Sequence, residues 1–220
     1  MVGRQVPQMV AALVLARVLG PETYGVISAA TVYVTFTTLL LDQGLAVALV
    51  QRPTLPPGMS GAVAMVNLLS AAILGACTIV ASGVVAQFFS APALAPLLSV
   101  LGGGLLLKGV AIAPRALLQR DLQFQRIGVA DLVGGTAGAT AGISAALAGA
   151  DTWSMAWMVL TTDTLVALVL ASFARSGWPN FRFGLLREIL PFSLRVFGSN
   201  ALAFLSRNLD NVVVGRFLGV

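Results

Sequence analysis

Residues 53–107 read PTLPPGMSGAVAMVNLLSAAILGACTIVASGVVAQFFSAPALAPLLSVLGGGLLL, and they contain no Asp, Glu, Lys or Arg. These 55 residues are long enough for two membrane spans, because a helix rises about 1.5 Å per residue and a bilayer core takes about 20 apolar residues. Proline cannot continue a helix, so the break between the spans is expected at residues 90–96, which include Pro92 and Pro96. The stretch therefore predicts transmembrane helices near Met59–Phe88 and Ala93–Ala113.

The whole chain is too apolar for a soluble protein. Of its 220 residues 58% are hydrophobic and 10% charged, and the mean hydropathy is +0.94, whereas globular domains carry about 25% charged residues. Further apolar stretches follow at 5–19, 24–50, 127–147, 152–174 and 189–218, with the first two separated by Gly20-Pro21. The sequence predicts an all-α, polytopic transmembrane helix bundle of about seven spans.

Positive charges fall on alternate connections between these spans. One set holds eight of them: Arg52, Lys108, Arg115, Arg120, Arg126, Arg175, Arg182 and Arg187. The opposite connections hold no Lys or Arg, and their charged residues are Glu22 and Asp151. Because Lys and Arg mark cytoplasmic loops, we expect a multi-pass membrane protein with a cytoplasmic N-terminus. Residues 115–126 fit either an amphipathic helix along the membrane surface or the inner ends of spans four and five.

Several function classes are disfavoured by what the sequence lacks. The chain has no His and one Cys, Cys77, so His-based metal or proton-relay sites and the usual Ser/His or Cys/His catalytic arrangements are absent. It has no Walker-type ATP-binding motif. The net charge of +5 comes from scattered residues, which does not favour nucleic-acid binding. We expect a protein that is not an enzyme and holds no cofactor or metal, although coupling to an ion or proton gradient is compatible with this interpretation.

The second span carries a polar stripe. It comprises Tyr24, Ser28, Thr31, Thr35, Thr38 and Asp42. At steps of three and four residues these side chains stay within roughly 60° on a helix. A stripe facing lipid would be unfavourable, so it faces either neighbouring helices, as Ser and Thr often do, or a water-filled path. We favour the path.

The seventh and sixth spans contain charges within apolar surroundings. The seventh holds Asn200, Arg207, Asp210 and Asn211 on one face, and Arg207 and Asp210 are three residues apart and can pair. Intramembrane charges indicate a substrate or coupling site by default; a structural ion pair joining helix bundles is the alternative. Asp163 in the sixth span either pairs with an Arg of another span or stays protonated.

The fifth span carries a face of small residues. Gly134, Gly138 and Gly142 recur every four residues. Such spacing is typical of helices that pack closely in membranes, so we interpret this face as structural.

An internal repeat indicates how the spans are organised. Residues 14–20, VLARVLG, match residues 213–219, VVGRFLG, at four of seven positions. Six spans lie between the two starts, and an even number gives both copies the same orientation. We therefore expect one six-helix lobe at residues 1–188 and the first helix of a second lobe at 189–220, as in the N-terminal half of a larger protein.

Five segments carry a family resemblance. They are LARVLGPETYGVISAA (15–30), DQGLAVALVQRP (42–53), PRALLQRDLQFQRI (114–127), PFS (191–193) and SRNLDNVVVGRFLG (206–219). In order and spacing they resemble the bacterial oligosaccharide and lipopolysaccharide flippases (Wzx type) of the multidrug/oligosaccharidyl-lipid/polysaccharide exporter superfamily.

The resemblance implies two helical bundles around a cavity and transport of undecaprenyl-diphosphate-linked oligosaccharide from the inner to the outer leaflet. It implies cavity or gate roles for Arg17, Asp42, Arg52, Arg207, Asp210 and Arg216. The partners would be the lipid bilayer, the lipid-linked oligosaccharide, and a missing C-terminal lobe or polysaccharide-assembly proteins. A cation-coupled multidrug exporter and a non-transporting membrane fragment are the alternatives.

Overall fold

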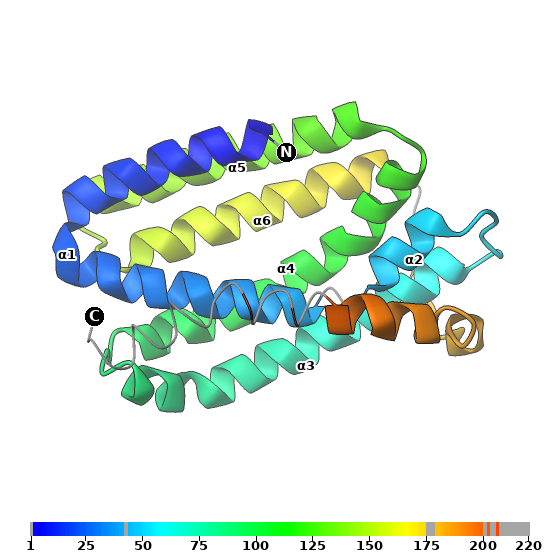
Figure 1. Cartoon of the computed structure of the whole chain (residues 1–220). Helices are drawn as coiled ribbons and strands as arrows, with labels where there is room; N and C mark the ends of the chain where they lie inside the picture. The colour runs from blue at the N-terminus through cyan, green and yellow to red at the C-terminus, as the bar shows by residue number, and fades with distance from the viewer. Residues whose placement is uncertain (1, 42–43, 175–178, 200–201, 203–205, 207–220) are drawn as a thin grey trace.

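The computed structural model describes residues 2–41, 44–174, 179–199, 202 and 206. Its elements are α1 (Val2–Leu41), α2 (Leu45–Gln51), α3 (Met59–Phe88), α4 (Leu94–Arg120), α5 (Phe124–Leu147), α6 (Trp153–Phe173) and the short 3-10 helix η1 (Phe183–Leu186). Residues 190–199 are also helical, and the described part of the chain contains no strand. The predicted all-α bundle is confirmed, with the first predicted pair of helices at α3 and α4 (Figure 1).

The described helices include three that are long and apolar enough to cross a membrane. These are α3, α4 and α6, and the bent pair Gly25–Leu41 and Leu45–Gln51 makes a fourth if it is one span. The 24 residues of α5 are long enough but are rich in Gly, Ala and Thr rather than large apolar side chains. The chain is thus a multi-pass membrane protein, while the full count of seven spans stays a prediction.

The N-terminal part of the chain differs from the expected separate spans. Gly20 and Pro21 lie inside one helix, α1, rather than in a connection. Figure 1 shows that α1 instead turns back on itself, so that its first half lies beside α5 and its second half runs below α6 in that view. Proline removes a backbone donor and bends a helix without always ending it, and the expected break appears here as this bend.

The expected span at 24–50 is interrupted instead near its end. Gly44 precedes α2 with a φ of 73°, a left-handed conformation that glycine adopts without strain. The following helix is bent by 50° from Gly25–Leu41. A Cβ at Gly44 would also lie 2.7 Å from the backbone oxygen of Ser193. Only glycine suits both the turn and this close approach.

The structure decides between the two interpretations of residues 115–126. Helix α4 continues to Arg120, a turn follows at residues 121–123, and α5 begins at Phe124. These residues are therefore the ends of two bundle helices and not a separate surface helix. Pro114 lies inside α4 without ending it.

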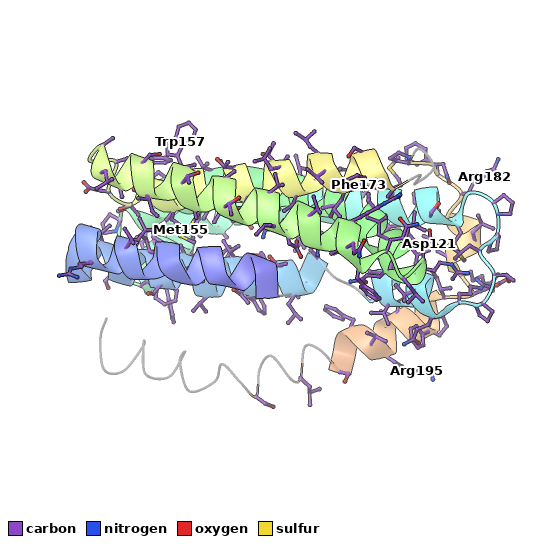
Figure 2. All side chains as sticks on the ribbon, turned by 90° about the horizontal axis from the view of Figure 1, so that it is seen from above. Asp121, Met155, Trp157, Phe173, Arg182 and Arg195 are labelled. Carbon is purple, nitrogen blue, oxygen red and sulfur yellow. The ribbon has the colours of Figure 1, made fainter. Side chains whose placement is uncertain are left out.

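The connections alternate between the two ends of the bundle. Figure 1 shows the connections at 52–58 and 121–123 and the described residues 179–189 at one end, and the connections at 89–93 and 148–152 at the other. Figure 2 shows Asp121, Arg182 and Arg195 at the same end of the bundle. The basic connections are thus grouped by the fold as the charge pattern predicts. Lys108 is an exception, because it lies inside α4 and faces the bundle interior.

A topology experiment can test the predicted orientation. In a Cys77→Ser background, single cysteines at the exposed positions Asp121, Arg182 and Asp151 report on the two ends. We expect a membrane-impermeant maleimide to label Asp151→Cys in intact spheroplasts. The Asp121→Cys and Arg182→Cys variants should react only in inverted vesicles. Labelling of Asp121→Cys from outside would reverse the orientation.

The glycine face of α5 packs against α6, as the sequence predicts. A Cβ at Gly134 would lie 2.9 Å from the Thr162 carbonyl oxygen, and one at Gly142 would lie 2.8 Å from the Cβ of Met158. At Gly138 it would lie 2.7 Å from the Met158 carbonyl oxygen and would also collide with the Thr162 hydroxyl. Helices α3 and α4 approach similarly, since a Cβ at Gly75 would lie 2.6 Å from the backbone oxygen of Gly102. Small residues let these backbones meet closely.

Candidate functional site

A cavity of about 560 Å³ lies between α1, α4 and α6. Its polar wall includes Ser28, Thr31 and Thr35 of α1, Thr162 and Asp163 of α6, and Lys108 of α4. Apolar side chains such as Met155 and Val159 complete it. We call it the larger cavity, and it brings together three positions of the predicted polar stripe.

A second cavity of about 260 Å³, the smaller cavity, lies next to it. It is lined by Thr38 of α1, Arg115 and Gln119 of α4, and again by Lys108 and Asp163. The described polar stripe thus continues from one cavity to the next. Because α1 runs past both, its hydroxyls form a polar strip along cavity walls that are otherwise largely apolar.

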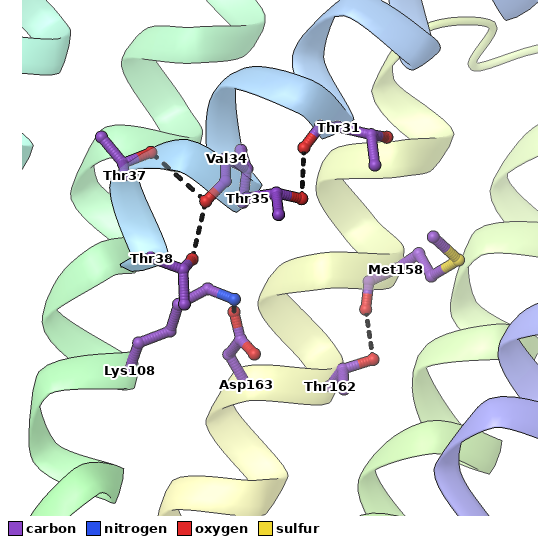
Figure 3. Close-up of polar contacts among 9 residues, drawn as sticks. All are labelled: Thr31, Val34, Thr35, Thr37, Thr38, Lys108, Met158, Thr162 and Asp163. Atoms are coloured by element: carbon purple, nitrogen blue, oxygen red, sulfur yellow. Dashed lines mark hydrogen bonds and ion pairs between the residues drawn. The ribbon is translucent and has the colours of Figure 1, made fainter. Parts of the chain in front are cut away.

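Lys108 and Asp163 form an ion pair at the boundary of these cavities (Figure 3), with 3.2 Å between Nζ and Oδ2. The Asp163 side chain is 6% exposed and that of Lys108 is 18% exposed. The sequence led us to expect either an arginine partner for Asp163 or a protonated acid, so this expectation is corrected. Lys108 is the single lysine of the chain and interrupts an apolar helix, which is the signal that could have identified it.

The threonines of the stripe donate their hydroxyl protons to their own helix. Thr31 donates to the Ile27 carbonyl at 2.8 Å, Thr35 to that of Thr31 at 2.7 Å, and Thr38 to that of Val34 at 2.7 Å. Each oxygen keeps lone pairs that can accept further hydrogen bonds from a group in the cavity. Thr31 and Thr35 are exposed to the cavity rather than packed against a neighbouring helix, so the geometry suits hydrogen bonding to a polar ligand.

A second ion pair ties α4 to α5 beside the smaller cavity. The guanidinium of Arg115 donates to both carboxylate oxygens of Asp131, at 2.5 and 3.2 Å. The Asp131 side chain is 8% exposed. Sequence reasoning did not single out this pair, although the two residues flank the short α4–α5 turn and a helical hairpin brings such residues together.

Arg52 lies at the end of the bundle, away from both cavities. It forms an ion pair with Glu188, and its backbone carbonyl accepts a hydrogen bond from Arg120. Arg120 also donates to the Leu49 carbonyl at 3.0 Å and that of Pro53 at 2.8 Å. These contacts hold the α2–α3 connection against the end of α4, and they favour an anchoring role for Arg52 in this conformation.

The remaining predicted site residues divide into two groups. Arg17 is described and is exposed on α1, but it does not line either cavity. The other group lies outside the described residues: Asp42, Asn200, Arg207, Asp210, Asn211 and Arg216, with the side chain of Tyr24. Their predicted roles stay predictions.

Comparison with known proteins gives the family. A model of the family described as "Polysaccharide biosynthesis protein" matches residues 14–220. The succinoglycan biosynthesis transport protein ExoT of Rhizobium meliloti is 26% identical over 209 residues, 94% of this chain and 42% of that protein. The lipopolysaccharide biosynthesis protein WzxC of Escherichia coli is 23% identical over 213 residues, 94% of this chain and 42% of that protein.

An uncharacterized membrane protein in the cps region of Klebsiella pneumoniae is 24% identical over 211 residues, 94% of this chain and 44% of that protein. The chain thus spans less than half the length of these relatives. No solved structure matches it. The match over residues 14–220 shows that this chain belongs to the polysaccharide biosynthesis protein family.

Proposed function

We propose that this chain forms the N-terminal lobe of a flippase that exports polysaccharide precursors. The substrate would be an undecaprenyl-diphosphate-linked oligosaccharide, carried from the inner to the outer leaflet of the bacterial inner membrane. The observation that carries the proposal is the line of cavity-facing hydroxyls on α1 beside the Lys108–Asp163 pair. The names of the relatives ExoT and WzxC, which refer to polysaccharide or lipopolysaccharide biosynthesis, support it.

The chemistry of the cavities suits such a substrate. Sugar hydroxyls can donate to the free lone pairs of Thr31 and Thr35. A diphosphate needs cations, and in a low-dielectric site its attraction to them is stronger than in water. The lipid tail would remain among the acyl chains, beside the exposed apolar side chains of α3 such as Ile73, Val80 and Val84.

The predicted two-lobe organisation completes this proposal. Residues 1–188 would form one lobe, and residues 189–220 would begin the second. Asn200, Arg207, Asp210, Asn211 and Arg216 would then face the first lobe across a shared cavity, with Arg17, Asp42 and Tyr24 near its entrances. The partner of this chain would be that second lobe, whether in the same polypeptide or in another subunit.

Export measurements test the proposed function. In a strain lacking the gene that encodes this chain, we expect loss of surface polysaccharide and accumulation of lipid-linked oligosaccharide in the inner leaflet, both reversed by a plasmid copy. A Thr31→Val/Thr35→Val copy should restore export roughly tenfold less well, because two neutral hydrogen bonds are lost. Valine keeps the side-chain shape.

Thr136→Val is the matched control. Thr136 is an exposed threonine of α5 whose hydroxyl also donates to its own helix, at 2.7 Å from the Leu132 carbonyl oxygen. It should restore export fully. Equal export by both copies at equal membrane abundance would contradict a role for the α1 hydroxyls, and normal polysaccharide in the deletion strain would refute the proposed function.

A further inference from the structure

We propose that Lys108 binds the anionic group of the transported substrate at the boundary between the two cavities, with Asp163 as the carboxylate that competes for the same ammonium group. This inference rests on the proposed function and adds to it the place where the anion sits. The anion is identified as a diphosphate, since that is the charged group of a lipid-linked precursor. An acidic sugar offers similar chemistry and is distinguished by the experiment below.

The two cavities lie in series along the bundle. On the second half of α1 the larger cavity contacts residues between 27 and 35, in addition to Leu15 of the first half, and the smaller contacts Thr38 and Leu41. On α6 the larger cavity ends at Asp163, where the smaller begins. On α4 the larger cavity contacts Lys108, and the smaller extends from Lys108 to Gln119. The order is the same on all three helices, and Lys108 and Asp163 are the two residues common to both linings.

Charge makes Lys108 the cation best placed for an anion that passes between the cavities. Among the residues that the structure describes, the charged ones lining the larger cavity are Lys108 and Asp163, and the smaller adds Arg115. Arg115 already donates to both oxygens of Asp131. An ammonium group has three N–H donors, so Lys108 can keep Asp163 as one partner and offer the others to a phosphate in either cavity.

Asp163 would limit how tightly the anion is held. A transport path must bind a charged substrate strongly enough for the substrate to enter and weakly enough for it to leave. A carboxylate 3.2 Å from Nζ competes with the phosphate for the same cation and holds the flexible lysine side chain at the boundary. A purely structural ion pair between α4 and α6 would have the same distance. A binding measurement is therefore needed to distinguish a structural role of the pair from a role in holding the anion.

The experiment measures binding to purified full-length protein in nanodiscs, with farnesyl diphosphate as the probe and sodium glucuronate as the acidic-sugar probe. We expect farnesyl diphosphate to bind and Lys108→Met to weaken it by about tenfold or more, since a charge-assisted hydrogen bond is lost. Lys108→Arg should retain binding because it keeps the charge and phosphate donors. Asp163→Asn should tighten binding by roughly threefold to tenfold, because the competing carboxylate is removed.

Arg182→Met, which removes a cation at an exposed position of the bundle end, is the control and should bind like the unaltered protein. If Lys108→Met does not accumulate, the Asp163→Asn and Lys108→Arg variants still decide the matter. Weaker binding by Asp163→Asn, in parallel with a lower thermal midpoint, would indicate a structural pair and overturn the proposal. Unchanged binding by folded Lys108→Met, no binding of farnesyl diphosphate, or binding of glucuronate alone would also overturn it.

These outcomes are separable from failure of the proposed function. Normal polysaccharide export in the deletion strain, together with Lys108-dependent binding of farnesyl diphosphate, would refute the exporter role and leave the anion site intact. Lost export in the deletion strain, together with binding of farnesyl diphosphate that does not depend on Lys108, would support the exporter role and refute the anion site.

Discussion

Replacing Arg115 by methionine should lower the free energy of unfolding by about 3–5 kcal/mol. The change leaves the Asp131 carboxylate, whose side chain is 8% exposed, without the guanidinium that contacts both of its oxygens. Methionine retains much of the apolar stem, so the loss comes mainly from the unpaired charge. Unfolding of the purified protein in nanodiscs or in a denaturing detergent titration would measure it.

A double substitution separates the cost of the unpaired acid from the value of the ion pair. In Arg115→Met/Asp131→Leu neither charge of this pair remains, and apolar replacement of a buried pair is often neutral or stabilising. We expect most of the lost stability to return. Arg182→Met removes an exposed cation and should change stability by less than about 0.5 kcal/mol. Equal destabilisation by the single and double substitutions would contradict this account.

Replacing Gly138 by alanine should destabilise the protein by about 1–3 kcal/mol. Its Cβ would meet the Thr162 hydroxyl and lie 2.7 Å from the Met158 carbonyl oxygen, so α5 and α6 must separate to accommodate it. The thermal midpoint in nanodiscs should fall. Gly138→Leu should have a larger effect and reduce the amount of protein in the membrane.

Gly128 is the matched control on the same helix. A Cβ there meets no atom within 4 Å, so Gly128→Ala should be neutral or stabilise by up to about 1 kcal/mol, because alanine loses less backbone freedom on folding. The two alanine substitutions are thus expected to have opposite signs. A fall in stability of the same size at both positions would show that helix packing is not the cause.

Much of the fold could be predicted because it depends on consecutive residues. The charge-free run at 53–107 predicts α3 and α4, and proline placed the break between them within a few residues of the observed one. The glycine spacing on α5 predicts its packing face. Proline was a weaker guide at Pro21, which lies inside α1 without ending it, because hydrogen bonds on either side can continue past a missing donor.

The polar stripe on α1 also followed from the sequence, since helical periodicity alone places residues 28, 31, 35 and 38 on one face. The sequence did not show what that face contacts. The structure divides the stripe between two cavities, and it pairs Lys108 with Asp163 and Arg115 with Asp131.

The sequence by itself determined the helical, membrane-spanning class of this protein, the approximate helix bounds and the packing face of α5. The reason is that apolar run length, proline and helical period are local properties. Only the tertiary structure decided the ion-pair partners and the boundary between the cavities. These depend on how α1, α4 and α6 pack side by side, and many helix arrangements are compatible with the same local pattern.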